Sequence, residues 1–269
     1  MSGAQAMMEA ALEAARAAGA AALAGFGRGL AVEIKGDGSP VTEADRSAER
    51  AAREWIAQRF PDDGILGEEH GAERPYAPRR WLIDPIDGTK SYVRGVPLWG
   101  SMVALVEGDR VMAGAMVFPA LGETIAAAPS CGAWWNGARC SVSRVADLAR
   151  ATVLTTDAGS SAATGDGAAR REGWQRLASR AAVSRTWGDC YGYLLVATGR
   201  AEVMVDPILA AWDAAALVPI VEEAGGAFSD WRGERSFTGG SAIATNTALA
   251  DEARRVLGSD MPALRREER

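Results

Sequence analysis

The sequence has few of the residues that many hydrolases use for catalysis. It contains one histidine, His70, and three cysteines among 269 residues. A Ser-His-Asp triad or a phosphohistidine mechanism would have to use His70, and a histidine-rich zinc site is excluded. No cysteine precedes an arginine at the spacing of a cysteine-dependent phosphatase loop. Carboxylates therefore remain the main candidates for catalysis, and His70, beside Glu69 in a glycine-flanked loop, is expected to be a surface residue.

Signals for several cellular contexts are also missing. The cysteines form no CxxC pair and no disulfide framework, which suits a reducing compartment. Glu9, Glu13 and Arg16 interrupt the Ala-rich start, so it predicts an opening helix and not an export signal. No apolar run is long enough to span a membrane, and a net charge of −6 matches nucleic acid or an anionic membrane poorly. We expect a cytoplasmic protein that acts on a small molecule, with no nucleic acid or membrane as partner.

The first part of the chain favours two helices followed by an antiparallel sheet. The helices are predicted over residues 3–28 and 42–60, with Thr42 as the N-cap of the second and Asp45 as its capping-box partner. Two pairs, Gly108-Asp109 and Asn136-Gly137, are hairpin signals. Apolar runs predict strands at 81–83, 101–107, 111–118 and 123–128. We expect the two helices to cover one face of this sheet.

Strand and helix alternate after about residue 150. Such alternation favours a sheet with crossover helices. The predicted strands are 151–156, 181–186, 201–206, 227–231 and 241–246, and the predicted helices are 189–199 and 213–226. We expect residues 1–148 and 149–269 to form two halves of one compact unit, with the functional site between them.

The stretch "WLIDPIDGTKS", residues 81–91, is the most informative in the chain. Asp84 and Asp87 end an apolar strand, Pro85 stops the strand ladder, and Gly88-Thr89 begin the next element with free backbone N–H groups. Free N–H groups at such a start favour an anion, and the aspartates favour a cation beside it. The alternative is an Asp-rich turn that only caps a helix.

Two other carboxylate segments could join this one. Glu68 and Glu69 follow Gly67, and because successive strand side chains alternate, one is expected to bind and the other to support it. Asp213 opens an apolar helix, where it could also be a simple N-cap. The set Glu68, Asp84, Asp87 and Asp213 offers four hard oxygen ligands and no soft ones, which suits Mg²⁺ and not zinc. Together these residues predict two-metal phosphoryl hydrolysis.

Two segments, "WLIDPIDGTKSYVRG" and "WDAAALVPIVEEAGG", resemble the signatures of the inositol monophosphatase superfamily in the correct order, and the resemblance spans nearly the full chain. It implies an α/β (α+β) fold, the layered αβαβα sandwich of the inositol monophosphatase and fructose-1,6-bisphosphatase type. It also implies a homodimeric, Li⁺-sensitive phosphomonoesterase that uses two or three Mg²⁺ per active site.

The resemblance assigns roles residue by residue. Catalysis would rest on Thr89, Asp45 and Glu68, with the Thr89 hydroxyl and Asp45 orienting a metal-activated water that attacks phosphorus directly. Glu69 would support the ligands, and Lys35 matches a position on a mobile flap. For Asp45 the alternative is a first-turn helix acid, and for Lys35 a solvated loop lysine. The implied metal ligands are Glu68, Asp84, Asp87, Asp213 and the backbone carbonyl of Ile86, and the implied phosphate-binding amides are those of Gly88 and Thr89.

Within the superfamily, "GTKSYVRGVPLWGSMVAL" and "WGDCYGYLLVATGRAEVMVDP" look like the histidinol-phosphatase branch, which hydrolyses L-histidinol phosphate in histidine biosynthesis. Histidinol carries an ammonium and an imidazole, so its pocket should offer acids and an aromatic wall. The resemblance places Asp189 and Asp206 at the substrate, and Arg185 is expected to border the same pocket. Asp206 could instead form an Asp-Pro turn, and Asp189 could be the N-cap of a helix beginning at Cys190.

Three alternatives stay open. Another phosphate ester, such as inositol 1-phosphate, fructose 1,6-bisphosphate or 3′-phosphoadenosine 5′-phosphate, could be the substrate, although no additional basic cluster for a bisphosphate is evident. A haloacid-dehalogenase mechanism would use an aspartate nucleophile, but its motif spaces two aspartates two apart, and Asp84 and Asp87 are three apart. A non-catalytic binding protein on the same scaffold is the third.

Overall fold

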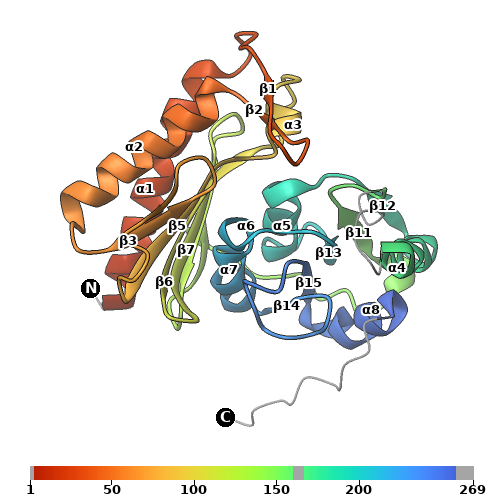
Figure 1. Ribbon diagram of the computed structural model, residues 1–269. Coiled ribbons are helices and arrows are strands. Elements are labelled where there is room, and N and C mark those ends of the chain that lie inside the picture. The colour runs from red at the N-terminus through yellow and green to blue at the C-terminus, as the bar shows by residue number, and fades with distance from the viewer. Residues whose placement is uncertain (1–2, 160–166, 259–269) are drawn as a thin grey trace.

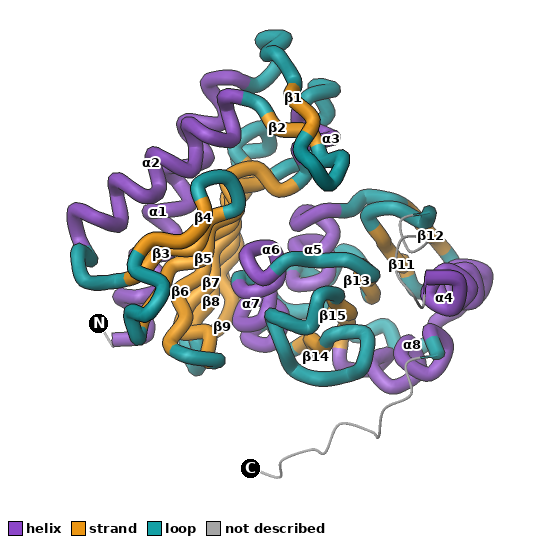
Figure 2. The backbone as a smooth tube through the Cα atoms, viewed as in Figure 1, coloured by secondary structure: helices purple, strands orange, loops and turns teal. Residues whose placement is uncertain are grey.

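The structure, a computed structural model, describes residues 3–159 and 167–258. Helices and sheets alternate in five layers, which confirms the predicted αβαβα sandwich (Figures 1 and 2). Two long helices cover the outer face of the larger sheet, a middle layer of helices lies between the two sheets, and two further helices cover the outer face of the smaller sheet.

The larger sheet is built from the first part of the chain. In the described residues it has eight strands in the order β10-β9-β8-β7-β6-β5-β3-β4. The elements of this part are α1 (Gly3–Gly25), β1 (Glu33–Ile34), β2 (Pro40–Val41), α2 (Glu43–Arg59), β3 (Gly64–Gly67), β4 (Gly71–Glu73), β5 (Arg79–Asp87), α3 (Thr89–Tyr92), β6 (Gly100–Glu107), β7 (Arg110–Phe118), β8 (Glu123–Ala128), β9 (Gly132–Trp135) and β10 (Ala138–Arg139).

The smaller sheet follows, with the order β12-β11-β13-β15-β14 in the described part of the chain. Its elements are the 3₁₀ helix η1 (Leu148–Arg150), β11 (Thr152–Thr155), α4 (Gly167–Arg180), β12 (Val183–Arg185), α5 (Asp189–Ala197), β13 (Val203–Asp206), α6 (Ala211–Ala215), α7 (Leu217–Glu223), β14 (Gly226–Ser229), β15 (Ala242–Asn246), η3 (Thr247–Leu249) and α8 (Ala250–Leu257). The two sheets lie on opposite sides of residue 148 in sequence, and the division of the chain there stays a prediction.

The first half follows the sequence pattern closely. Both opening helices and both hairpins are where we expected them, and Thr42 and Asp45 form the predicted capping box at the start of α2. One expectation was wrong, because the sheet is mixed: β3 runs parallel to β5, while β5 to β9 are antiparallel. The parallel pair places the end of β3 beside the middle of β5, and so residues 67–68 beside residues 83–84.

The layers are held together by three apolar cores. Small side chains let α1 lie close to the sheet: its inward face is alanine, and Ala11, Ala15 and Ala18 are fully buried. Alternate residues of β6 point into different cores, with Val103 on the side of α1 and Met102 on the side of the middle helices. A third core lies between the smaller sheet and α4 and α8. Among the described helices, none combines the length and apolarity needed to cross a membrane.

The helix predicted over 213–226 is two helices, α6 and α7, because Pro219 cannot donate the backbone hydrogen bond that would continue α6 through Ala215. In addition, α6 starts at Ala211, earlier than expected. Asp213 is therefore the third residue of the helix and not its N-cap, and its Oδ2 accepts a hydrogen bond from the Ala210 amide at 2.8 Å.

Candidate active site

The two aspartates of β5 are aimed by a β-bulge. Asp84 lies opposite Met102 and Asp87 lies opposite Gly100, so three steps on β5 match two steps on β6. In a regular strand, residues three apart point to opposite faces; one extra residue restores them to the same face. The bulge is therefore the feature that lets Asp84 and Asp87 serve one site.

Ser101 on β6 stabilises the bulge. Pro85 has no N–H for the ladder, and its carbonyl accepts a hydrogen bond of 2.6 Å from the hydroxyl of Ser101, which is fully buried. The next amide, Ile86, donates to Asp84 Oδ1 at 3.0 Å. These bonds satisfy the polar groups of a buried irregular strand, which would otherwise be costly.

Gly88 turns the chain from β5 into the short helix α3. Its φ is +91°, a left-handed conformation that favours glycine. The amides of Gly88 and Thr89 stand at the start of α3, where no earlier turn of that helix can accept their hydrogen bonds. Such amides suit an anion, and their role in binding phosphate stays a prediction.

The Thr89 hydroxyl lies between Asp45 and the Ile86 carbonyl. It is 3.3 Å from Asp45 Oδ1 and 2.9 Å from the Ile86 oxygen, and its single proton can serve one of these acceptors at a time. The other carboxylate oxygen of Asp45 accepts the amide and hydroxyl of Thr42, each at 2.7 Å. Asp45 is thus held rigidly by the capping box with one oxygen facing Thr89, a task in addition to that of a first-turn helix acid.

Glu68 and Glu69 leave β3 in a turn and do not alternate as strand residues would. The Glu68 amide donates to the Ile83 carbonyl at 3.2 Å, which fixes Glu68 beside Asp84. Lys35, from the hairpin β1–β2, contacts both carboxylates: its Nζ is 2.7 Å from Glu68 Oε1 and 2.5 Å from Glu69 Oε1. Because β3 ends at Gly67, strand alternation does not extend to this pair, and the expectation that one carboxylate binds while the other supports it stays a prediction.

The second half of the chain contributes two contacts at the same place. The first turn of α5 donates the Cys190 amide to Asp87 Oδ2 at 2.5 Å. On α6, the Asp213 carboxyl lies near that of Asp84, and each affects the pKa of the other. The site therefore lies between the larger sheet and the middle helices (Figure 1).

Burial, followed by repulsion between neighbours, raises the pKa values of these carboxylates. Burial, and then the charges of Glu68, Asp87 and Asp213, raise the pKa of Asp84 well above its usual value. Burial, followed by the charge of Asp213, raises the pKa of Asp87 to about 8. The pKa of Asp213 is raised to about 7, again chiefly by burial. Negative charge at this place is unfavourable unless a cation neutralises it.

The donor set fits a hard divalent cation. All the side-chain groups are carboxylates, and the Ile86 carbonyl adds another oxygen, as Mg²⁺ prefers. In the part of the chain that the structure describes, however, no three Asp, Glu, His or Cys side chains are gathered into a ready-made metal site. Each carboxylate has a protein partner instead: Lys35 on Glu68, Cys190 N on Asp87 and Ala210 N on Asp213. The individual metal-ligand roles stay predictions.

The three residues predicted to contact substrate lie in different surroundings. Asp189, the first residue of α5 and not an N-cap, has its carboxylate against the turn: an added Cβ at Gly88 would lie 3.1 Å from Asp189 Oδ2. Burial, and then the charge of Asp87, raise the pKa of Asp189 to about 7. Arg185 is exposed at the sheet edge, where its guanidinium donates to the Ser184 carbonyl.

Asp206, the third of them, is buried at the end of β13. Its Oδ1 accepts the Thr156 amide at 3.0 Å and its Oδ2 accepts the Tyr193 hydroxyl at 2.9 Å. Burial raises the pKa of Asp206 to about 7, although both hydrogen bonds oppose this rise. Both oxygens thus have protein partners, and contact of Asp206 with the substrate stays a prediction.

Sequence reasoning missed Ser101, the Cys190 amide and Tyr193. Ser101 lies on an apolar strand, and only its position opposite the Pro85 bulge reveals its purpose. A backbone donor such as Cys190 N carries no side-chain signal. Tyr193 sits one helical turn from Asp189 in sequence, and its spacing to Asp206 has no local signature.

We expect the stability of the metal-free protein to fall as pH rises. Asp87, Asp189, Asp206 and Asp213 have folded pKa values of about 7 to 8, above the value of about 4 in unfolded chains. The folded state therefore binds more protons, so this stabilisation is complete below about pH 4 and is lost as pH rises through 7 to 8. Thermal melts in EDTA between pH 5 and 9 would measure it.

The same melts with Mg²⁺ provide the comparison. A cation that replaces the protons should raise the melting temperature more at pH 8 than at pH 5. If the difference between EDTA and Mg²⁺ did not grow with pH, these carboxylates would not be the groups that bind the cation.

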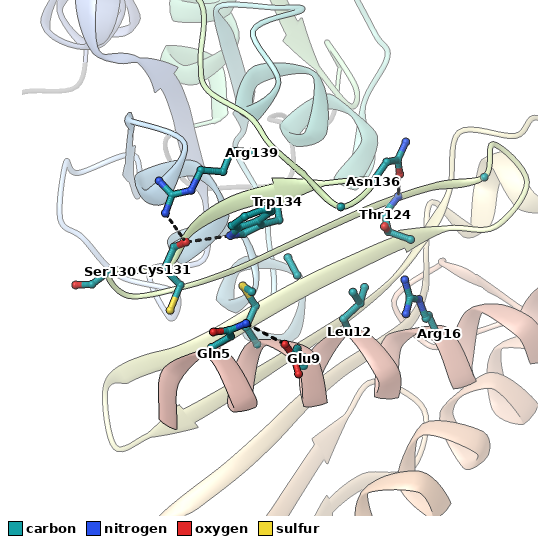
Figure 3. Close-up of a pocket in the computed structure, with 14 residues that line it drawn as sticks. Gln5, Glu9, Leu12, Arg16, Thr124, Ser130, Cys131, Trp134, Asn136 and Arg139 are labelled. Atoms are coloured by element: carbon teal, nitrogen blue, oxygen red, sulfur yellow. Dashed lines mark hydrogen bonds between the residues drawn. The ribbon is translucent and has the colours of Figure 1, made fainter. Parts of the chain in front are cut away.

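A groove of about 900 Å³ lies elsewhere, between α1 and the β8–β10 edge of the larger sheet (Figure 3). Glu9, Leu12 and Arg16 line it from the helix, and Trp134 and Arg139 line it from the strands. None of the candidate metal-binding or substrate-binding carboxylates lines it. The concentration of buried acids beside a bulge, and not the volume of a surface groove, locates the candidate active site.

Comparisons with known proteins agree with this geometry. The sequence profile described as "Inositol monophosphatase family" matches residues 4–261. The chain is 44% identical to the histidinol-phosphatase of Chlorobaculum parvum, over 90% of this chain and 93% of that protein. It is 40% identical to the histidinol-phosphatase of Mycobacterium tuberculosis, over 83% and 86%. The solved inositol monophosphatase of Zymomonas mobilis superposes with a TM-score of 0.83 at 31% identity, covering 96% of this chain and 100% of that one.

Proposed function

The chain belongs to the inositol monophosphatase family and is a phosphatase, and we propose that it hydrolyses L-histidinol phosphate to L-histidinol and phosphate. The observation that carries this proposal is the bulge that brings Asp84 and Asp87 to one face, beside Asp213 and the Thr89–Asp45 pair. The identity to histidinol-phosphatases over most of both chains supports the choice of substrate.

The residues divide the work of ester hydrolysis among them. Bound Mg²⁺ would neutralise charge on the phosphoryl group and make a coordinated water more acidic. Glu68, Asp84, Asp87, Asp213 and the Ile86 carbonyl would hold it. The Thr89 hydroxyl would orient the attacking water, and Asp45, whose pKa burial raises, would accept a proton through that hydroxyl. The Gly88 and Thr89 amides would bind phosphate oxygens.

A cationic substrate explains the acid beside the turn. Asp189 lies against Gly88, where the phosphate amides begin, so its carboxylate is in reach of the alcohol portion of a bound ester. Histidinol carries an ammonium that such a carboxylate can pair with, whereas inositol carries only hydroxyl groups. We propose that Asp189 reads this ammonium. Asp206 supports the same pocket through Tyr193, and Arg185 borders it.

A panel of phosphate esters tests the proposed function. Turnover with Mg²⁺ is measured on histidinol phosphate, inositol 1-phosphate, fructose 1,6-bisphosphate and 3′-phosphoadenosine 5′-phosphate, each with an EDTA control. We expect the highest kcat/KM on histidinol phosphate and no turnover in EDTA. Equal or higher kcat/KM on another ester would overturn the substrate, and full turnover in EDTA would overturn the metal-dependent mechanism.

We expect Asp189→Asn to lower kcat/KM on histidinol phosphate by about 10- to 100-fold, because a charge-assisted hydrogen bond contributes roughly 1.5–3 kcal/mol. The activity on inositol 1-phosphate, which has no ammonium, should change much less. Asp109→Asn, in the exposed β6–β7 turn, is the matched control. An equal loss of kcat/KM on both esters would show that Asp189 does not bind the ammonium group.

Three finer expectations accompany this function. We propose that the cation is Mg²⁺, with two or three ions per site, because the donors are all oxygen. We also propose a homodimer in the cytoplasm, following the family resemblance and the cysteine usage. Metal analysis of the purified protein would test the identity and number of the cations, and sedimentation would test the homodimer.

A further inference from the structure

A buried carboxylate outside the predicted set lies directly behind the Glu68 turn. Glu49, on the inner face of α2, is fully buried. We propose that Glu49 is a positioning residue: it shapes the turn from Gly67 to Gly71 and thereby aims Glu68 at the metal. This inference rests on the proposed function, since it concerns how one of the proposed metal ligands is held.

Glu49 contacts the turn through two backbone amides, and its Oε1 also lies 3.4 Å from His70 Nδ1. Its Oε2 accepts the Glu69 amide at 2.6 Å, and its Oε1 accepts the His70 amide at 3.2 Å. A turn directly after a strand leaves such amides without ladder partners, and a buried amide without a partner is costly. Glu49 thus replaces the missing strand partner for the two residues that follow Glu68.

Arg53, one helical turn along α2, completes the arrangement. Its Nε donates to Glu49 Oε1 at 2.7 Å, which neutralises the buried charge, and its second nitrogen donates to the Gly71 carbonyl at 2.5 Å. The pair therefore holds both ends of the turn: Glu49 binds donors at its start and Arg53 binds an acceptor at its end.

Gly67 shows how closely Glu49 approaches the chain. A Cβ added at Gly67 would collide with the Glu49 carboxylate, so only glycine leaves room for it. Glu49 therefore contacts residues 67, 69 and 70, on both sides of Glu68. With its neighbours fixed in this way, Glu68 has its backbone direction set, and its side chain contacts Lys35.

A second buried acid offers a matched comparison. Asp63 is 4% exposed and binds the Arg79 guanidinium and the Trp81 indole, so it also stabilises the region of β3 and β5. It makes no contact with the Glu68 turn in any hydrogen bond of the described residues. Loss of Asp63 should therefore lower stability without changing cation binding.

The experiment compares Glu49→Gln and Asp63→Asn with the wild type in three measurements: Mg²⁺ affinity by calorimetry on the metal-free protein, the Mg²⁺ dependence of the melting temperature, and hydrogen exchange of the Glu69 and His70 amides. We expect Glu49→Gln to weaken Mg²⁺ binding by about 10- to 100-fold, the usual effect of removing a group that supports a ligand. In this variant the Glu69 and His70 amides should exchange faster with solvent. Its kcat at saturating Mg²⁺ should fall much less than its affinity for Mg²⁺. Asp63→Asn should keep the wild-type affinity.

Gly67→Ala provides a second route, because its methyl group would displace the Glu49 carboxylate without removing it. Like Glu49→Gln, it should weaken Mg²⁺ binding. If Glu49→Gln does not fold, Gly67→Ala alone tests the positioning role of Glu49. Wild-type Mg²⁺ affinity in the folded Glu49 or Gly67 variant would overturn the positioning role alone. A wild-type protein that bound no Mg²⁺ would overturn the proposed function, and this inference with it.

Discussion

Replacing Asp84 by asparagine is expected to abolish most Mg²⁺-dependent phosphatase activity while raising the melting temperature of the metal-free protein. Removal of a group that only supports a ligand costs about 10- to 100-fold, so loss of an anionic ligand should exceed about 100-fold. At the same time burial, and then the charges of Glu68, Asp87 and Asp213, raise the pKa of Asp84. An amide of the same shape removes this repulsion, so the stability at pH 8 in EDTA should increase.

The opposite signs of the two effects make the test selective. Activity assays and thermal melts on the same preparation measure them. Asp63→Asn, another buried acid but one paired with Arg79, should lose stability and retain activity. If Asp84→Asn kept its activity, the metal-ligand role would be wrong. Trapping of a phosphoaspartate at Asp84 would instead support a nucleophilic aspartate and refute direct attack by water.

Thr89→Ala is the second change with a large expected effect. We expect kcat to fall by about 10²- to 10⁴-fold, the range for loss of a positioned proton-transfer group, because the hydroxyl is the only link between Asp45 and the site in the hydrogen bonds described. The Mg²⁺ affinity and the melting temperature should change little, since Thr89 contributes no predicted metal-binding side chain. Steady-state kinetics at saturating Mg²⁺, with calorimetry for the metal, would measure both.

Thr89→Ser is the control, because it keeps the hydroxyl that contacts Asp45 and the Ile86 carbonyl. It should retain most of the activity that Thr89→Ala loses. A serine variant as inactive as the alanine variant would show that the Thr89 methyl group, and not the hydroxyl, is the essential part. A fully active alanine variant would remove Thr89 and Asp45 from the mechanism.

The sequence indicated acids that the structure brings near one another, but not how they converge. Asp84 and Asp87 are three apart, and strand periodicity alone would place them on opposite faces; only the bulge reverses this, and Pro85 was its single local signal. The bulge depends on the pairing with Met102 and Gly100 and on the Ser101 hydroxyl, which are contacts across strands. No pattern within residues 81–91 contains that information.

Long-range pairing also explains the elements that the sequence did not reveal. The strand β3 has four residues, two of them glycine, and it runs parallel to β5. It therefore has neither the length nor the hairpin turn that would predict a strand from the sequence. The helix α4 buries few apolar residues, and its sequence shows little apolar periodicity. In contrast, the start of α2 was predictable, because Thr42 and Asp45 form a capping box within four residues.

The contacts of Asp213 and Lys35 were only partly predictable from the sequence. The sequence placed Asp213 near a helix start, but its exact position depends on where Ala210 begins the helix, and Ala210 carries no capping side chain. Lys35 reaches Glu68 and Glu69 across more than thirty residues, a contact that the hairpin β1–β2 creates. The family resemblance suggested both residues, and the structure shows the contacts that they make, while their roles stay predictions.

The middle layer of helices makes the two halves dependent on each other for folding. One continuous core contains Met102 and Met116 of the larger sheet, Leu194 and Leu217 of the helices, and Met204 of the smaller sheet. A chain divided near residue 148 would leave the inner face of the larger sheet and the facing sides of α5 and α7 in water, as large apolar surfaces prone to association. The carboxylates of β5 and α6 meet only when this core is closed, so the candidate active site forms only in the fully assembled chain.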